Sequence, residues 1–163
     1  ETNVLLAHHT YKNQQLNIPI HQWKNIELTV TDIKKRFDKL YKVMSTEVFV
    51  VNENDLIELV FKIMEWKSIH HVPVVDRCNK IVGLIDKEQL RNYDFSKEKN
   101  KMIIAKKIMK KTFISCSPEG LVSEAKQQME QLNSSCVLIM EADEFLGVFT
   151  NNDVTKIENL LKN

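Results

Sequence analysis

The period of apolar and polar residues changes along the middle of the chain in a way that separates strands from helices. After Asn54, which is suited to cap a helix, apolar residues recur at helical spacing from Leu56 to Met64. Runs rich in β-branched residues precede and follow this helix, and the polar stretch at 76–79 is typical of a hairpin turn. The pattern therefore predicts a strand, a helix, two strands and a closing helix, at residues 48–51, 56–64, 72–75, 81–85 and 87–93.

The same order of elements recurs 65 residues further on, so the chain contains an internal repeat. Met64 and Glu65, for example, recur as Met129 and Glu130. Gly83 and Gly147 occupy equivalent places, one residue off that spacing. The second copy predicts its strand, helix, paired strands and closing helix at residues 113–116, 121–132, 137–140, 145–150 and 154–161.

A single copy would expose much of the apolar face of its three-stranded sheet, whereas two packed copies bury it. We therefore expect an α/β (α+β) fold of two β-α-β-β(-α) repeats. The polar residues at 96–100 are the expected linker between the copies. The expected domains are a tail or linker from a preceding domain, the first repeat with a leading helix, and the second repeat, at residues 1–31, 32–95 and 96–163. The leading helix would be capped by Asp32, and its apolar positions are Ile33, Phe37, Leu40, Tyr41 and Met44.

Composition excludes several classes of function. The 23 Lys and Arg residues balance 22 Asp and Glu residues, and the resulting net charge of +1 disfavours a nucleic-acid partner. No two of the 3 glycines lie close enough to form a phosphate-cradling loop of the Walker or dinucleotide-binding type. No apolar run approaches the roughly 18 residues of a membrane span. Three cysteines without C-x-x-C spacing favour a reducing, cytoplasmic setting.

Catalytic and metal-binding motifs are not recognisable in the sequence. It has no serine nucleophile elbow, no zinc triad and no Cys–His pair spaced for one site, so we expect no enzymatic activity. His70 and His71 are adjacent, but neighbouring strand residues face opposite sides of a sheet, so we do not expect them to chelate a metal ion. Because the chain begins at Glu1, we expect it to be part of a longer protein.

Three short motifs at the repeat spacing resemble those of the CBS domain, which occurs in tandem pairs called Bateman modules. Val43, Met44 and Ser45 precede the first strand of the first copy, and Ile108 and Met109 precede that of the second. The sequence His-Val-Pro-Val-Val-Asp lies in the middle of the first copy. The sequence Gly-Val-Phe-Thr-Asn-Asn-Asp, at 147–153, is similar to the family signature G-x-x-[ST]-x-x-D. The resemblance covers residues 32–161.

The resemblance implies a pseudo-two-fold pair of repeats with clefts between them, where family members often bind AMP, ADP, ATP or S-adenosylmethionine. In the signature, Thr150 and Asp153 lie at a turn from strand to helix. A carboxylate there can accept hydrogen bonds from both ribose hydroxyls, and the threonine hydroxyl and helix-start amides can reach a phosphate. The alternative is structural, with Asp153 stabilising the helix N-terminus and Thr150 ending the strand.

The family pattern places the adenine ring against apolar strand residues, where burial of a ring face contributes affinity. The candidates are Thr112, Phe113 and Ile114 in one strand and Cys136, Val137 and Leu138 in another. His71 and Lys111 are candidates for phosphate contacts. For Phe113 and Val137, an ordinary core position is the alternative interpretation.

The first copy departs from the signature. Asp86 stands where the hydroxyl is expected, and Gln89 stands where the ribose carboxylate is expected. Because a carboxylate repels a phosphate where solvation is poor, we expect at most one well-formed nucleotide site.

Together these features favour a module that senses an adenine nucleotide and regulates an attached domain, with no required cofactor. Members of the family commonly pair through their helices, so a homodimer is also expected. The alternative is a ligand-free interaction module with vestigial clefts, whose helices dimerise the parent protein or dock a partner. Asp86 and Gln89 support this alternative for one cleft, whereas Thr150 and Asp153 oppose it for the other.

Overall fold

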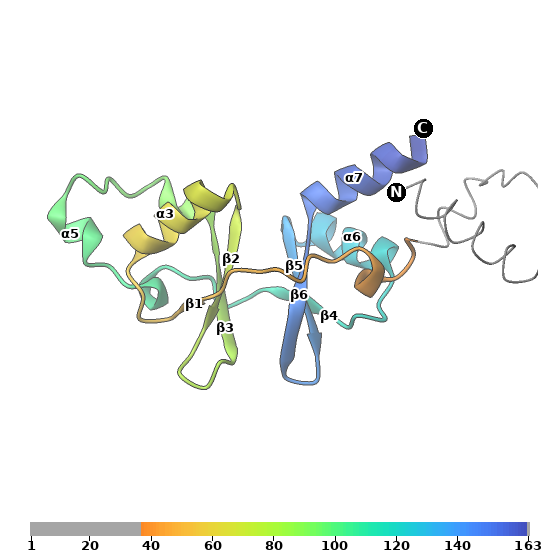
Figure 1. Ribbon diagram of the computed structural model, residues 1–163, viewed down its shortest axis with the longest axis horizontal. Coiled ribbons are helices and arrows are strands. Elements are labelled where there is room, and N and C mark those ends of the chain that lie inside the picture. Colours follow the sequence, from red (N-terminus) through yellow and green to blue (C-terminus); the bar gives the residue numbers. More distant parts are fainter. Residues whose placement is uncertain (1–36, 163) are drawn as a thin grey trace, which may run out of the picture. The chain divides into compact units, whose positions relative to one another are not determined.

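The computed structural model describes residues 37–162, which form two repeats, each with a three-stranded sheet (Figure 1). In the first repeat, β1 pairs in parallel with β2, and β2 pairs antiparallel with β3. The elements of this repeat are β1 (Val51–Asn52), α3 (Ile57–Lys67), β2 (His71–Val75), β3 (Ile81–Asp86) and α4 (Lys87–Leu90). The predicted order of strand, helix, two strands and helix is confirmed. Residues 1–31, the predicted tail or linker, lie outside the described residues.

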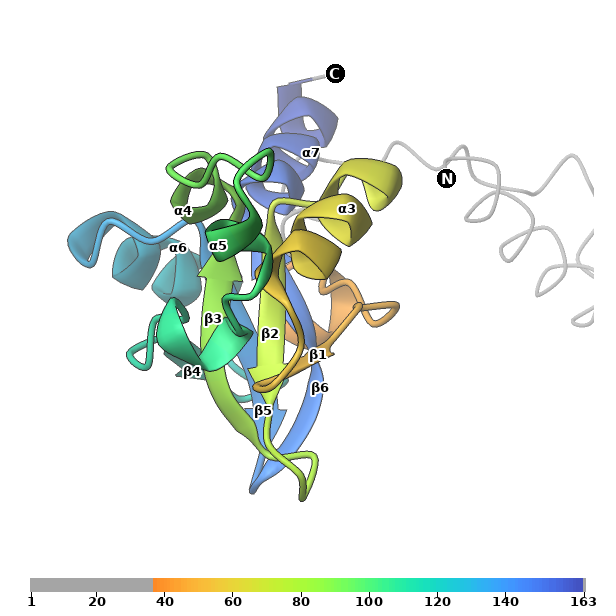
Figure 2. The same ribbon diagram turned by 90° about the vertical axis from the view of Figure 1, so that its left-hand side faces the viewer.

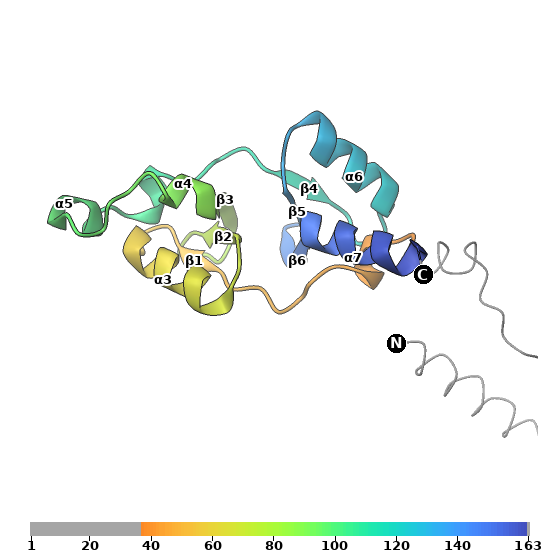
Figure 3. The same cartoon turned by 90° about the horizontal axis from the view of Figure 1, so that it is seen from above.

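The second repeat has the same topology, with β4 parallel to β5 and β5 antiparallel to β6. Its elements are β4 (Ile114–Cys116), α6 (Val122–Gln131), β5 (Cys136–Glu141), β6 (Glu144–Thr150) and α7 (Asn151–Lys162). Seen from above, α3 and α4 lie with the first sheet, and α6 and α7 lie with the second (Figure 3). The expected mixed fold of two β-α-β-β(-α) repeats is therefore confirmed.

Each repeat is completed by the segment that precedes the other repeat in the chain. Residues 38–45, the first lead-in segment, contact the second repeat: the Leu40 amide donates to the Gly120 carbonyl at 3.0 Å, and Ser45 and Val148 exchange two backbone hydrogen bonds. Residues 103–110, the second lead-in segment, contact the first repeat, where Leu84 and Lys110 exchange the equivalent pair. Figure 1 shows both connections passing between the repeats.

Buried side chains of each lead-in segment also lie in the core of the repeat that the segment does not precede. Leu40 is fully buried in the core of the second repeat, together with Phe149. Ala105 and Met109 lie in the core of the first repeat. Each core is therefore built from two parts of the chain that are distant in sequence.

The two repeat-spaced glycines lie where the lead-in segments cross the sheets. A Cβ atom on Gly147 would lie 2.5 Å from the Ser45 carbonyl oxygen, and one on Gly83 would lie 2.9 Å from the Lys110 carbonyl oxygen. The one-residue offset between these glycines comes from the hairpins: Val75 pairs with Ile81, whereas Met140 pairs with Phe145. The second hairpin is thus one residue shorter.

A third apolar cluster joins the two sheets. Its buried members are Leu84 from the first sheet and Cys136, Leu138 and Val148 from the second. In Figure 2 the hairpin of β2 and β3 is seen in front of the hairpin of β5 and β6. Because of this contact, the C-terminal ends of β3 and β6 lie near each other, and two cavities between the repeats form there.

Several predicted boundaries are wrong. Helix α3 begins after Leu56 rather than Asn54, because the Asn54 amide bonds to the Asn52 side chain within a turn. Helix α4 ends at Leu90, and the predicted linker contains a short helix, α5 (Glu98–Lys101).

The predicted leading helix is also wrong for its described part, residues 37–44. A three-residue 3-10 helix, η2 (Leu40–Lys42), is present there. The backbone of this segment bonds to the second repeat instead of continuing a helix of its own. Residues 32–36 lie outside the described residues.

Candidate functional site

A cavity of about 550 Å³ opens between the two repeats, and we name it the Asp153 pocket. The end of β6 and the start of α7 form one side, and the residues after the first lead-in segment form another. The apolar part of the lining includes Val48, Phe49, Ile69 and Val148. The polar part includes Ser45, Glu47, Ser68, His70, His71, Asp86, Lys87, Glu88, Arg91, Ser135, Thr150, Asn151, Asn152, Asp153 and Lys156.

Asp153 lies in the first turn of α7 and is 6% exposed. Its Oδ2 atom accepts hydrogen bonds from the Thr150 amide at 3.0 Å and the Thr150 hydroxyl at 2.8 Å. Its Oδ1 atom lies 3.3 Å from Lys156 Nζ. Asp153 therefore has the structural role that the alternative interpretation gave it, and Oδ1 retains capacity to accept a hydrogen bond from a ligand.

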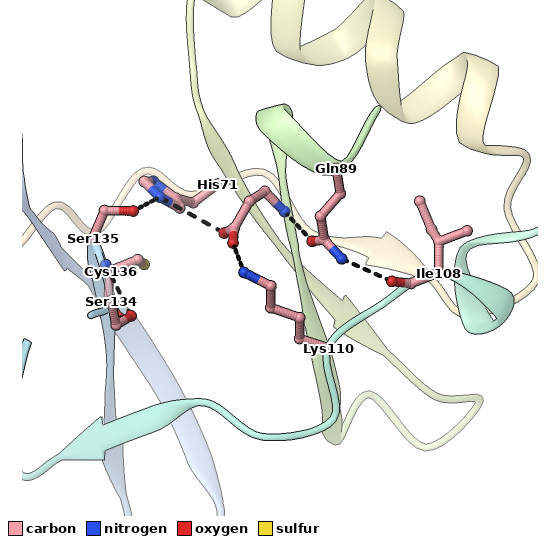
Figure 4. A network of polar contacts seen from close by, with 8 residues as sticks. His71, Gln89, Ile108, Lys110, Ser134, Ser135 and Cys136 are labelled. Carbon is pink, nitrogen blue, oxygen red and sulfur yellow. Dashed lines mark hydrogen bonds and ion pairs between the residues drawn. The ribbon is translucent and has the colours of Figure 1, made fainter. Parts of the chain in front are cut away.

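In the first repeat, Gln89 occupies the position that Asp153 occupies in the second. Gln89 Oε1 accepts a hydrogen bond from the Asp86 amide at 2.8 Å, as Asp153 does from Thr150. Gln89 Nε2 donates to the Ile108 carbonyl at 2.9 Å, as Figure 4 shows. The Gln89 side chain is thus used to hold the second lead-in segment in place.

Asp86 is the centre of a polar network between the repeats. Its Oδ2 atom forms an ion pair with Lys110 Nζ at 2.5 Å, and its Oδ1 atom lies 3.7 Å from His71 Nε2. His71 Nε2 also lies 2.7 Å from Ser135 Oγ in the second repeat (Figure 4). Burial lowers the pKa of His71, and the Asp86 charge opposes this effect, so the imidazole is mainly neutral at pH 7.

A second cavity, of about 670 Å³, lies next to the Asp86–Lys110 ion pair, and we name it the Lys110 pocket. It is the pseudo-symmetric counterpart of the Asp153 pocket, since Lys110 follows Ser45 by the repeat spacing. Four residues, Asp86, Glu88, Ser135 and Asn151, line both pockets. The remaining lining residues are Leu84, Lys110, Thr112, Phe113, Ile114, Leu132, Asn133 and Ser134.

The structure distributes the sequence-predicted site residues over three places. Thr150, Asp153 and His71 line the Asp153 pocket, whereas Thr112, Phe113 and Ile114 line the Lys110 pocket. Cys136, Val137 and Leu138 are buried and line neither pocket, and Lys111 is exposed outside both linings. Burial raises the pKa of the Cys136 thiol to about 12, so the thiol is protonated.

Sequence reasoning missed the contribution of 45–49 to the Asp153 pocket. These residues precede β1, the first strand of the first repeat, yet the hydrogen bonds between Ser45 and Val148 carry them to β6 of the second repeat. The one available signal was the repeat itself, because Thr112, Phe113 and Ile114 are the repeat-spaced equivalents of Glu47, Val48 and Phe49.

No group of three or more His, Cys, Asp or Glu side chains within residues 37–162 is arranged to hold a metal ion. No helix in the same range is long and apolar enough to cross a membrane.

The chain belongs to the CBS domain family. The family model of the CBS domain matches residues 40–96 and 105–159, which cover the two repeats and most of the lead-in segment before each. A solved structure of the CBS domain pair of protein MJ0100, in complex with 5′-methylthioadenosine and S-adenosyl-L-methionine, has a TM-score of 0.67 and 21% sequence identity. The match covers 76% of this chain and 97% of that one.

Two curated relatives are longer enzymes. A homoserine O-acetyltransferase from Methanohalobium evestigatum is 23% identical over 116 residues, which are 71% of this chain and 23% of the relative. An inosine-5′-monophosphate dehydrogenase from Methanocaldococcus jannaschii is 24% identical over 139 residues, which are 84% of this chain and 27% of the relative. The chain spans about a quarter of the length of these relatives.

Proposed function

We propose that the chain is a regulatory module that binds an adenosine-containing ligand in the Asp153 pocket and controls an attached domain. The observation that carries this proposal is the buried Asp153 carboxylate, held by Thr150 at the edge of a 550 Å³ cavity lined by both repeats. The CBS domain pair of MJ0100, which binds two adenosine derivatives, supports the ligand class.

In the proposed complex, Asp153 Oδ1 accepts a hydrogen bond from a ribose hydroxyl. The adenine ring lies against Val48, Ile69 and Val148, which supply the apolar part of the lining. The Thr150 hydroxyl already donates its hydrogen bond to Asp153. Thr150 therefore accepts a hydrogen bond from the ligand or positions the Asp153 carboxylate for it. His71 lies in the same lining and links it to Ser135.

Control of an attached domain follows from the position of the cavity. A ligand that contacts 45–49, the start of α4 and the start of α7 favours the arrangement of repeats that closes the cavity around it. Ser45 of the first lead-in segment lines the pocket, so the position of this segment depends on whether a ligand is bound. A coupling free energy of about 1 to 3 kcal/mol is typical for such a device. The longer relatives, which carry this region beside further sequence, support the same interpretation.

Thermal-shift measurements with AMP, ADP, ATP and S-adenosylmethionine test the proposal. At least one ligand should raise the melting temperature, and Asp153→Ala should abolish the shift. Because Asp153 also holds the start of α7, Asp153→Asn is a gentler second variant, which keeps an acceptor oxygen for the Thr150 amide. The melting temperature without ligand reports whether each variant folds. Stabilisation by none of the four ligands would favour the interaction module, and stabilisation that survives Asp153→Ala would reject this site.

An interaction role has its own support in exposed apolar side chains. Leu59 and Trp66 of α3 are 48% and 73% exposed, and Phe49 is 40% exposed. We propose that this surface, Leu59, Trp66 and Phe49, mediates a homodimer of the module. Leu59 and Trp66 do not line the Asp153 pocket, whereas Phe49 does, so the proposed dimer surface adjoins the pocket at Phe49.

A further inference from the structure

The Asp153 pocket carries a small excess of negative charge. Four carboxylates line it, against three Lys and Arg side chains, so the formal charge of these seven side chains is −1. The carboxylates are Glu47, Asp86, Glu88 and Asp153, and the cations are Lys87, Arg91 and Lys156. A nucleotide phosphate adds one to four further negative charges to the same space.

Each lining cation already has a carboxylate partner. Lys87 pairs with Glu65, Arg91 lies 3.8 Å from Glu88, and Lys156 lies 3.3 Å from Asp153. If Arg91 or Lys156 turned toward a phosphate, it would leave one of the lining carboxylates without its cation. The net charge of the cavity would be unchanged by such a movement.

The start of α7 is also poorly suited to hold a phosphate. The Asn151 amide donates to the Ser135 carbonyl at 3.2 Å. The Asp153 carboxylate lies in the first turn and offsets the positive end of the helix dipole. The usual attraction of a helix N-terminus for an anion is therefore reduced here.

Asp86 opposes a phosphate more effectively than the exposed glutamates. Its side chain is 18% exposed, whereas that of Glu88 is 86% exposed and more strongly screened by water. Lys110 compensates the Asp86 charge, but Lys110 lines the other pocket. The Asp86–Lys110 pair therefore presents its carboxylate, but not its ammonium group, to the Asp153 pocket.

We propose that the Asp153 pocket selects adenosyl ligands that carry no phosphate, neutral thioethers and cationic sulfonium compounds, and that Asp86 is a specificity-determining residue. This inference rests on the proposed function and adds the chemical class of the ligand. The shared adenosine is bound through Asp153 and the apolar lining, whereas charge at the 5′ position decides between ligands.

Calorimetric titration of the whole chain with 5′-methylthioadenosine, S-adenosylmethionine, AMP and ATP tests the inference. The first two ligands should bind at least about tenfold more tightly than AMP, and ATP should bind more weakly than AMP. Raising the salt concentration should narrow these differences. 5′-Methylthioadenosine and AMP share the adenosine, so their comparison isolates the charge.

Asp86→Asn removes the lining charge and releases Lys110, and it keeps the backbone amide that donates to Gln89 at the start of α4. This variant should tighten AMP about tenfold and change 5′-methylthioadenosine by less than about twofold. Asp143→Asn is the matched control, because Asp143 also pairs with a lysine, Lys80 at 3.0 Å, but lines neither pocket. The control should leave all four affinities unchanged.

The outcomes separate this inference from the proposed function. Equal or tighter binding of AMP or ATP, lost in Asp153→Ala, would overturn the charge selection and keep the adenosine site. Unchanged AMP affinity in a folded Asp86→Asn variant would overturn the role of Asp86. Binding of none of the four ligands would overturn both proposals.

Discussion

Gly147 lies beneath the first lead-in segment at a separation that leaves no room for a side chain. A Cβ atom there would lie 2.5 Å from the Ser45 carbonyl oxygen, which is itself bonded to the Val148 amide at 3.0 Å. Gly147→Ala should therefore push the segment off the sheet and destabilise the protein by about 2 to 3 kcal/mol. Urea unfolding followed by circular dichroism measures this change.

Gly83→Ala provides the comparison. There the nearest atoms are those of the Met109 side chain, at 2.7 and 2.8 Å, which can move more easily than backbone. The nearest backbone atom, the Lys110 carbonyl oxygen, would lie 2.9 Å away, compared with 2.5 Å for the Ser45 oxygen at Gly147. The free energy of unfolding should therefore fall less than in Gly147→Ala. An equal or larger loss for Gly83→Ala would contradict this account of the two crossings.

His71 should make stability depend on pH near neutrality. Burial lowers its pKa in the folded protein, so below about pH 6.5 the unfolded chain binds the proton more readily. The contribution of neutral His71 to the free energy of unfolding is complete above that pH and is lost as the pH falls. The free energy of unfolding should fall more between about pH 7.5 and 5.5 in the natural chain than in His71→Gln, with a slope below about 1.4 kcal/mol per pH unit.

His70→Gln is the matched control for this pH dependence, because His70 is an exposed neighbour of His71. The free energy of unfolding of this variant should still fall between about pH 7.5 and 5.5, because His71 is retained. If His71→Gln and His70→Gln gave the same profile as the natural chain, the titration of His71 would not contribute.

At the scale of elements, α3 presents an apolar face to solvent. Leu59 and Trp66 are seven residues apart and share that face, and the Lys67 ammonium lies 3.9 Å from the centroid of the Trp66 ring and 4.9 Å from that of Phe49. If α3 mediates the proposed homodimer, Leu59→Ser with Trp66→Ala should shift the chain from dimer to monomer in sedimentation velocity. The folded repeats should be unchanged, because both side chains are largely exposed.

Leu132→Ser is the control for loss of an exposed apolar side chain, since Leu132 is 67% exposed just after α6. It should leave the sedimentation coefficient unchanged. A natural chain that sediments as a monomer at every concentration would reject the dimer.

The order of elements could be predicted because it depends on local periodicity. The apolar runs at 72–75 and 81–85 and the helical spacing from Leu56 to Met64 are properties of short windows, and each corresponds to an element of the structure. The cap of the first helix could not be predicted from periodicity, because the Asn54 amide bonds to the Asn52 side chain within a turn. Leu56, with no side-chain bond to the helix start, precedes α3 instead.

The composition of each pocket could not be predicted in the same way, because it depends on which lead-in segment crosses which sheet. Thr112, Phe113 and Ile114 were grouped with Thr150 and Asp153 as parts of one copy. The structure instead places 45–49 beside Thr150 and Asp153, through the hydrogen bonds between Ser45 and Val148. Such a contact joins residues about a hundred positions apart, and no local pattern reports it.

At the scale of the described molecule, the exchange of lead-in segments should make the two repeats unfold together. Leu40 is fully buried in the second core but lies on the chain just before the first repeat, and Ala105 and Met109 show the reciprocal arrangement. Neither core can form from its own repeat alone. Thermal unfolding should therefore show one transition, with equal calorimetric and van't Hoff enthalpies.

Leu40→Ala tests this coupling because it creates a cavity in one repeat only. It should cost about 2 to 5 kcal/mol. In hydrogen exchange, protection should fall in β2 and β3 of the first repeat as well as in β5 and β6 of the second, since global opening governs both. Leu132→Ala, which removes an exposed leucine, should leave protection unchanged in both sheets. Loss confined to β5 and β6 would mean that the repeats unfold independently, and the lead-in segment could not then transmit a ligand's preference from one repeat to the other.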